Sequence, residues 1–151
     1  MKTLRPILLI FIVFAFVCSS CNKSDTNPQI LDISLKINGT LKSSGAPVAV
    51  YYQSSKTLQL AGIFNTTEAV SIMVPNVAVG SFDVAVNNLT VTYSPDANYL
   101  DTYFGSIGTV TITTLNGALV AGTFQFTGAN AGNTVGTVTE GKFQAQLSFQ
   151  P

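Results

Sequence analysis

The chain lacks several residue types on which common chemistries depend. Its 151 residues include no His and no Trp, only two Cys, and only 9% charged side chains. Without His, a His-ligated metal, a Ser-His-Asp triad and a His general base are excluded. Seven Lys and Arg balance seven Asp and Glu, which argues against a nucleic-acid binder because phosphate contacts need clustered cations. We therefore expect no cofactor, no bound metal and no enzymatic activity.

The first twenty residues have the order of a secretory signal peptide. Lys2 and Arg5 make a basic start, and the eleven residues 7–17 contain no polar side chain. A bilayer span needs about 20 apolar residues, so this run fits a signal core better than a transmembrane anchor. We predict a signal peptide over residues 1–20.

Both cysteines lie at the end of this segment, at positions 18 and 21. None follows, which excludes a disulfide-stapled secreted domain. Ser19 and Ser20 followed by Cys21 resemble the lipobox of bacterial lipoproteins, whose cysteine is acylated and becomes residue one of the mature chain. The resemblance implies lipidation of Cys21 with palmitate-type chains that hold the protein on a membrane. Each buried CH₂ group of such a chain contributes about 0.8 kcal/mol to the free energy of membrane binding. The alternatives are acylation of Cys18 and ordinary signal cleavage beside an incidental cysteine.

Residues 21–29 are polar, include one Pro and show no hydrophobic period. Such composition predicts a flexible tether. Lys23 and Asp25 within it resemble the Lys-then-acid signal that sends lipoproteins of the Bacteroidetes group to the cell surface. The resemblance implies the outer membrane as the location, on its surface-exposed or its periplasmic face.

The remaining residues, 30–151, alternate apolar and polar side chains over much of their length. The runs 31–38 and 142–149 show this period of two clearly, and it places one set of side chains on a core face and the other in water. Asn38-Gly39 and Asn116-Gly117 separate alternating runs, which is a strong hairpin signal. We predict an all-β fold, a single antiparallel β-sandwich of about nine or ten strands, with a flattened or lipocalin-like barrel as the alternative.

Three segments in a fixed order carry a resemblance to a known family. They are Lys36-Ile37-Asn38-Gly39, residues 108–113 (Gly-Thr-Val-Thr-Ile-Thr) and residues 122–126 (Gly-Thr-Phe-Gln-Phe). From Leu35 onward the chain resembles small outer-membrane lipoproteins of Bacteroidetes whose function is unknown. The resemblance implies an address and a fold, and it brings no activity, cofactor or catalytic residue.

The densest group of candidate binding residues lies between positions 93 and 104. It holds three of the five Tyr and two acids, and aromatic faces beside carboxylates and amides on a loop can bind sugars or peptides. The acids and the amide could also offer oxygens to Ca²⁺, but their spacing does not fit an EF-hand loop. The alternative is a connection whose rings close the edge of the sandwich. The candidate ligand-binding residues are Tyr93, Asp96, Asn98, Tyr99, Asp101 and Tyr103.

Three functions compete for such a chain. The first is a lipid-anchored envelope protein acting as a non-catalytic binding or scaffolding module for a glycan, a peptide or an envelope protein. The second is a lipocalin-like carrier of a small apolar ligand, which needs an empty interior. The third is a hydrolase, which needs two acids such as Glu68 and Asp83 to converge about 5–10 Å apart in a cleft. The carrier would be contradicted by a core filled by Phe64, Phe82, Phe124, Phe126 and Phe143.

Overall fold

The computed structural model describes residues 30–151, so the predicted signal peptide, the lipidation site Cys21 and the tether lie outside the described residues. This part contains ten strands, one short 3₁₀ helix and no α-helix, which confirms the all-β prediction. Over the same range, no helix is long and apolar enough to cross a membrane. The strands are β1 (Asp32–Ile37), β2 (Thr40–Ser44), β3 (Val48–Tyr52), β4 (Thr57–Ile63), β5 (Ala69–Val74), β6 (Gly80–Asp83), β7 (Thr90–Ser94), β8 (Tyr103–Leu115), β9 (Leu119–Ala129) and β10 (Val135–Gln150).

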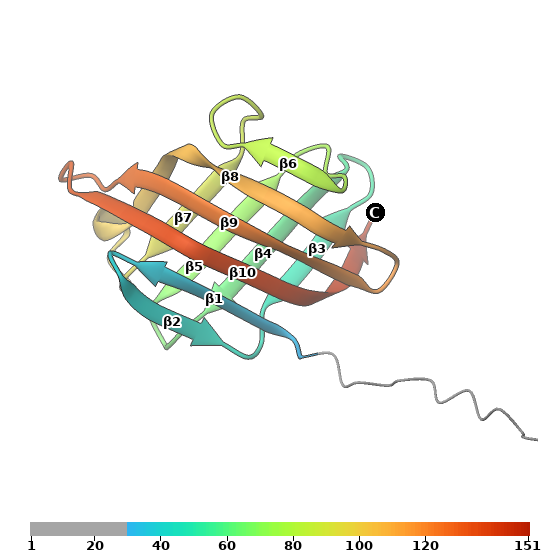
Figure 1. Ribbon diagram of the computed structural model, residues 1–151, viewed down its shortest axis with the longest axis horizontal. Helices are drawn as coiled ribbons and strands as arrows, with labels where there is room; N and C mark the ends of the chain where they lie inside the picture. Colours follow the sequence, from blue (N-terminus) through green and yellow to red (C-terminus); the bar gives the residue numbers. More distant parts are fainter. Residues whose placement is uncertain (1–29) are drawn as a thin grey trace, which may run out of the picture.

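The strands form two layers packed face to face (Figure 1). The front layer runs β2-β1-β10-β9-β8-β6, and the rear layer consists of β3, β4, β5 and β7. The layers are joined at both sides, since β10 pairs with β3 and β8 pairs with β7. The path of paired strands β10-β3-β4-β5-β7-β8-β9 therefore returns to its start. The fold is sandwich-like, but its two layers share hydrogen-bonded edges.

All strand pairs are antiparallel except β10 with β3, which is parallel. Turn chemistry explains the antiparallel hairpins. Asn38 and Gly39 both have positive φ, 48° and 84°, as a two-residue turn that matches strand twist requires. The β8–β9 turn works differently, because the side-chain Oδ1 of Asn116 accepts the N–H groups of Ala118 and Leu119 at 3.0 and 2.9 Å.

The core lies between the two layers and is filled by side chains from both. Ile33, Leu35 and Leu60 are fully buried, and each such side chain contributes roughly 1.5–3 kcal/mol of hydrophobic stabilisation. The five phenylalanines that would contradict a carrier all take part in this packing. Phe124, Phe126 and Phe143 are buried in the core. Phe64 and Phe82 are partly buried and pack against it. The described interior is packed rather than hollow, which argues against the carrier.

Candidate functional site

The β7–β8 connection presents four of the six predicted binding residues. The side chain of Asn98 caps the 3₁₀ helix η1 (Tyr99–Asp101), because its Oδ1 accepts the Leu100 N–H at 3.2 Å. Its Nδ2 donates to Asp101 Oδ2 at 2.6 Å, and its own N–H is accepted by Asp96 Oδ1 at 2.8 Å. The carboxylates and the amide therefore stabilise the loop itself. The Tyr99 ring, in contrast, is 71% exposed.

The other two predicted residues, Tyr93 and Tyr103, face inward. Tyr93 is only 2% exposed and belongs to the core. Tyr103 is half-buried against that core, with its ring centroid 6.3 Å from that of Tyr93. A Cβ at Gly136 would lie 2.7 Å from the Tyr103 ring, so the ring packs directly on the β10 backbone. The structure thus divides the predicted set into a surface group and an interior pair.

Three strands of the front layer form a hollowed surface on its outer side. One hollow of about 200 Å³ is lined by Ile107, Gln125 and Thr137 among others, and a second of about 390 Å³ by Gln125 and Lys142 among others. Gln125 lines both, so the two hollows lie next to each other along β9, and we call the pair the trough. Its remaining lining residues are Gly108, Thr109, Thr111, Thr123, Phe124, Phe126, Thr127, Val138, Thr139, Glu140 and Gly141. The second hollow alone falls within the range of about 300–1,000 Å³ of ligand pockets.

Irregularities in the strands on both sides of β9 accompany the trough. The register shifts between Gly105 and Ile107 in β8 and between Val138 and Gly141 in β10. Such bulges bend a strand and re-aim its side chains. Gly108 has a φ of 149°, and a Cβ there would lie 2.2 Å from the Gln125 carbonyl oxygen. Only glycine permits this approach of β8 to β9, so the trough depends on backbone geometry as well as on side chains.

An exposed apolar strip continues the trough at one end. Phe104, Ala129 and Val135 stand opposite one another on β8, β9 and β10 and therefore share a face. The Tyr99 ring packs edge-on against Phe104, with centroids 5.5 Å apart, and Ile107 is exposed beside them. We call Tyr99, Phe104, Ile107 and Val135 the aromatic strip. Contiguous exposed apolar groups of this kind mark interaction surfaces.

The trough combines hydroxyl and amide side chains with apolar surface, and the apolar surface is slightly the larger part in both hollows. Thr123, Gln125 and Thr137 are exposed, and they face the outer side of the front layer. The charged lining residues are Glu140 and Lys142, at the end away from the aromatic strip. Glu140 accepts an ion-paired hydrogen bond from Lys36 at 2.8 Å. The surface therefore mixes hydroxyl, amide and apolar groups, carries charge only at one end, and is bordered by rings at the other.

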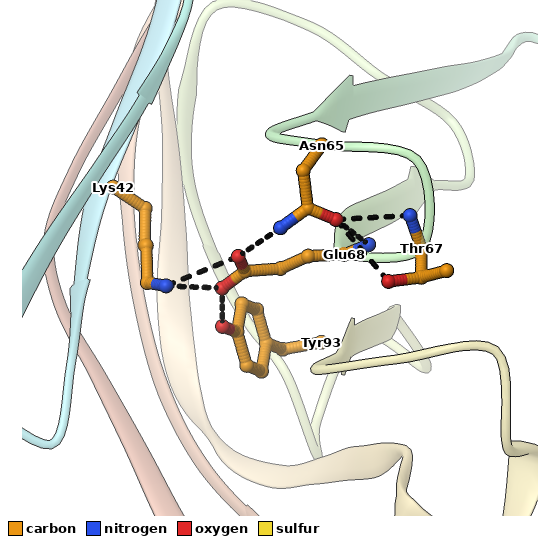
Figure 2. A network of polar contacts seen from close by, with 5 residues as sticks. All are labelled: Lys42, Asn65, Thr67, Glu68 and Tyr93. Atoms are coloured by element: carbon orange, nitrogen blue, oxygen red, sulfur yellow. Dashed lines mark hydrogen bonds and ion pairs between the residues drawn. The ribbon is translucent and has the colours of Figure 1, made fainter.

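A second polar cluster surrounds a buried carboxylate, and its partners range from the buried Tyr93 to the exposed Asn65 (Figure 2). Glu68, 4% exposed, precedes β5 and receives four contacts on its carboxylate. Lys42 of β2 lies 2.9 and 3.0 Å from its two oxygens. Asn65 Nδ2 donates to Oε2 at 2.9 Å, and the Tyr93 hydroxyl of β7 donates to Oε1. We call these four residues the Glu68 network.

The contacts in this network shift the pKa values of Glu68 and Tyr93. Burial by itself raises the pKa of the Glu68 carboxyl group. The hydrogen bonds from Tyr93, Lys42 and Asn65, together with the Lys42 charge, outweigh that effect, so the pKa lies below its ordinary value. Burial and the adjacent Glu68 carboxylate raise the pKa of the Tyr93 hydroxyl far above 10. Glu68 is therefore a carboxylate with its acceptor sites occupied.

The two acids considered as a hydrolytic pair make separate sets of contacts. Asp83 Oδ1 accepts the backbone N–H groups of Ala85 and Val86, both at 2.9 Å, in the turn that follows β6. Glu68 is held by its own network, and the two carboxylates share no partner. Within residues 30–151 there is also no group of three or more Cys, Asp or Glu side chains placed to hold a metal ion.

Comparison with known proteins identifies a family. A family model described as a domain of unknown function (DUF6252) matches residues 35–145. The chain belongs to this family. Membership confirms the expectation of a family without known function, and the match begins at the residue where the resemblance was placed. No curated protein and no solved structure matches this DUF6252 chain.

The trough of the DUF6252 domain escaped sequence reasoning. Its residues come from β8, β9 and β10, and on each strand they read as ordinary solvent-facing positions. Neither Phe104 nor Gln125 belongs to a sequence pattern that indicates a binding residue. The signal that could have located the trough is the glycine at 108 inside an alternating run, because such a glycine indicates a bulge or a close backbone approach.

Proposed function

We propose that this DUF6252 protein is a non-catalytic binding module of the cell envelope, held by a lipid on Cys21, and that it binds its partner in the trough. The observation that carries the proposal is the trough itself, which ends in the exposed aromatic strip. A rigid sheet supplies the framework, since both neighbours of β9 hydrogen-bond to it along its length. Binding residues on such a framework need little ordering when a ligand arrives.

The absence of catalysis is part of the proposal and is supported by the state of the acids. Glu68 is buried and its acceptor sites are occupied. A general acid or base must reach a proton on the substrate within hydrogen-bond distance, and a carboxylate enclosed by Lys42, Asn65 and Tyr93 cannot do so without breaking its own contacts. Asp83 is likewise used by its turn.

The anchor gives the protein its place on the outer membrane. The sequence around Cys21 supports this part of the proposal, because small residues precede that cysteine and a polar segment follows it. Replacing Cys21 by Ser should move the protein from the membrane pellet to the soluble fraction, as two or three acyl chains are lost. Cys18→Ser is the matched control and should leave it in the pellet. A Cys21→Ser protein that still sediments with membranes would refute the anchor.

Occupation of the trough can be tested by cysteine labelling in isolated cell envelopes. Thr123 on β9 lies in the trough, and Thr90 on β7 is an equally simple exposed threonine on the rear layer. We expect Thr123→Cys to react with a maleimide several-fold more slowly in envelopes than in purified protein. Thr90→Cys should react at the same rate in both. The predicted acylation of Cys21 and removal of Cys18 leave the introduced thiol as the reactive one.

Equal rates for Thr123→Cys in envelopes and in purified protein would show an open trough and would contradict the binding proposal. Slower labelling of both variants would indicate general shielding by the envelope, and it would contradict the assignment of the trough as the contact surface. The proposal thus requires protection of Thr123→Cys alone.

A further inference from the structure

We infer that the ligand of the trough is a neutral polysaccharide chain that lies along β9, from the aromatic strip to Lys142. This inference rests on the proposed function, because it names the chemical class that the same surface would bind. Its basis is the combination of three properties of this surface, namely its length, the row of hydroxyl and amide side chains among apolar groups with charge only at the Lys142 end, and the exposed rings at the other end.

The trough is elongated rather than round. Consecutive cross-strand rows run along β9, starting with Phe104–Ala129–Val135 and continuing past Thr127 to the row that contains Thr123 and Lys142. Thr127 lies four positions from Thr123, which at about 3.3 Å per residue is about 13 Å of trough, and the aromatic-strip row at Ala129, six positions from Thr123, extends the surface to about 20 Å. A surface of this shape suits several units of a linear chain better than one compact small molecule.

The lining matches the chemistry of sugars. A threonine hydroxyl donates one hydrogen bond and accepts others, and a glutamine amide does both at separate atoms. Sugar hydroxyls have the same double capacity, so Thr123, Gln125 and Thr137 can each pair with them in either direction. The Tyr99 and Phe104 rings, whose faces carry partial negative charge, can pack against the C–H groups of a sugar ring.

Charge argues against an anionic polymer. Such ligands need several unpaired cations along the contact surface. Lys142 lies at one end of the trough, and Lys36 is already paired with Glu140 at 2.8 Å. Between these residues and the aromatic strip, the lining consists of hydroxyl, amide, apolar and glycine residues.

The position of β9 argues against an extended peptide. Peptides that bind sheets usually add to an exposed edge, where unpaired N–H and C=O groups give affinity. β9 is a central strand, paired with β10 on one side and β8 on the other. A peptide over it would find only side-chain partners for its backbone groups, and would leave many of them unpaired.

The test is retardation of the full chain, in a nonionic polyoxyethylene detergent, during native electrophoresis through gels that contain a polysaccharide. Soluble starch, hydroxyethyl cellulose, galactomannan and dextran serve as neutral probes, and alginate as the acidic one. Phe104→Ala is compared with Phe149→Ala. These two phenylalanines are 39% and 42% exposed, and each packs edge-on against a tyrosine, Tyr99 at 5.5 Å and Tyr51 at 5.8 Å.

We expect retardation by at least one neutral polysaccharide, weakened about tenfold or more by Phe104→Ala and unchanged by Phe149→Ala. A second variant, Gln125→Ala, should weaken it several-fold without altering the thermal unfolding midpoint. Retardation by alginate alone, or equal retardation of both phenylalanine variants, would overturn the inference.

Failure of the inference can be separated from failure of the proposed function. If no neutral polysaccharide retards the protein while Thr123→Cys stays protected in envelopes, the trough binds a ligand of another class and the polysaccharide assignment is wrong. If the protection is absent as well, the binding proposal is wrong too.

Discussion

The Glu68 network and the trough both collect polar side chains from several strands, but they use them in opposite ways. In the network, three polar side chains are turned toward the buried carboxylate of Glu68, although Asn65 is itself exposed and Lys42 partly so. In the trough, Thr123, Gln125 and Thr137 are turned toward solvent. A buried polar group must be satisfied within the fold, since leaving it unpaired costs about 1–3 kcal/mol. Exposed groups carry no such requirement and remain available for a partner.

The comparison predicts that, among substitutions in the trough, those that disturb the backbone lower the free energy of unfolding most. Gly108→Ala should lower the free energy of unfolding by about 3 kcal/mol, because its Cβ would collide with the Gln125 carbonyl and its φ of 149° disfavours any side chain. Gly117→Ala is the control, since a Cβ there meets nothing within 4 Å, and it should change stability by less than about 0.5 kcal/mol. Urea unfolding measures both. Equal effects would show that β8 and β9 do not approach as described.

The second prediction contrasts a buried acid with an exposed one. Glu68→Gln should destabilise the protein by about 2 kcal/mol, because Lys42 loses its counter-charge and the new amide N–H₂ group faces the N–H donors of Lys42 or Asn65. Glu140→Gln also removes one partner of a Lys–Glu pair, but that glutamate side chain is 64% exposed, and the expected loss is about 0.5 kcal/mol or less. The measurement is chemical unfolding of the two variants side by side.

The third prediction concerns pH. The pKa of Glu68 is lowered in the folded protein, so its contribution to stability is present above its ordinary value of 4.5 and is lost as the pH falls through the folded pKa. The pKa of Tyr93 is raised, so its contribution is present below about 10 and is lost at higher pH. Unfolding measured from pH 3 to 7 should show a shallower acid decline for Glu68→Gln than for the unaltered chain.

The smallest effect is expected for a side chain on the trough surface. Thr123→Val removes one exposed hydroxyl and keeps the β-branched shape, so the free energy of unfolding should change by less than about 0.5 kcal/mol. Thermal unfolding of this variant beside the unaltered chain would measure it. A loss above about 1 kcal/mol would mean that Thr123 serves the fold, and it would erase the contrast with the Glu68 network.

The sequence was sufficient for the fold class because strand periodicity and turn chemistry are local. The pattern at 31–38 and the turn at Asn38-Gly39 both correspond to observed structure. The parallel pairing of β10 with β3 could not be predicted, because no hairpin links them and hydrophobic alternation is indifferent to strand direction.

In the candidate site too, features set by neighbouring residues could be predicted, and contacts between residues far apart in the sequence could not. Tyr99 could be chosen because it stands in a polar connection, and it is exposed. Tyr93, six positions earlier, stands beside the same polar connection in the sequence. It nevertheless lies in β7, and its hydroxyl donates to the buried Glu68. That contact also depends on Lys42, which is far away along the chain, so no local pattern contains it.

The pairing of β1 with β10 also has a consequence for how the protein reaches its native state. Asp32 at the start of β1 stands opposite Gln144 in β10. The first strand of the described domain therefore cannot form this pairing until the last strand is present. Folds dominated by contacts between distant residues fold slowly, because long loops must close first. A chain that emerges from its amino terminus, whether from a ribosome or from a secretion channel, cannot complete this sheet until almost all of it has been released. Residues 32–37 therefore remain without their β10 partner for most of the time that the chain takes to emerge.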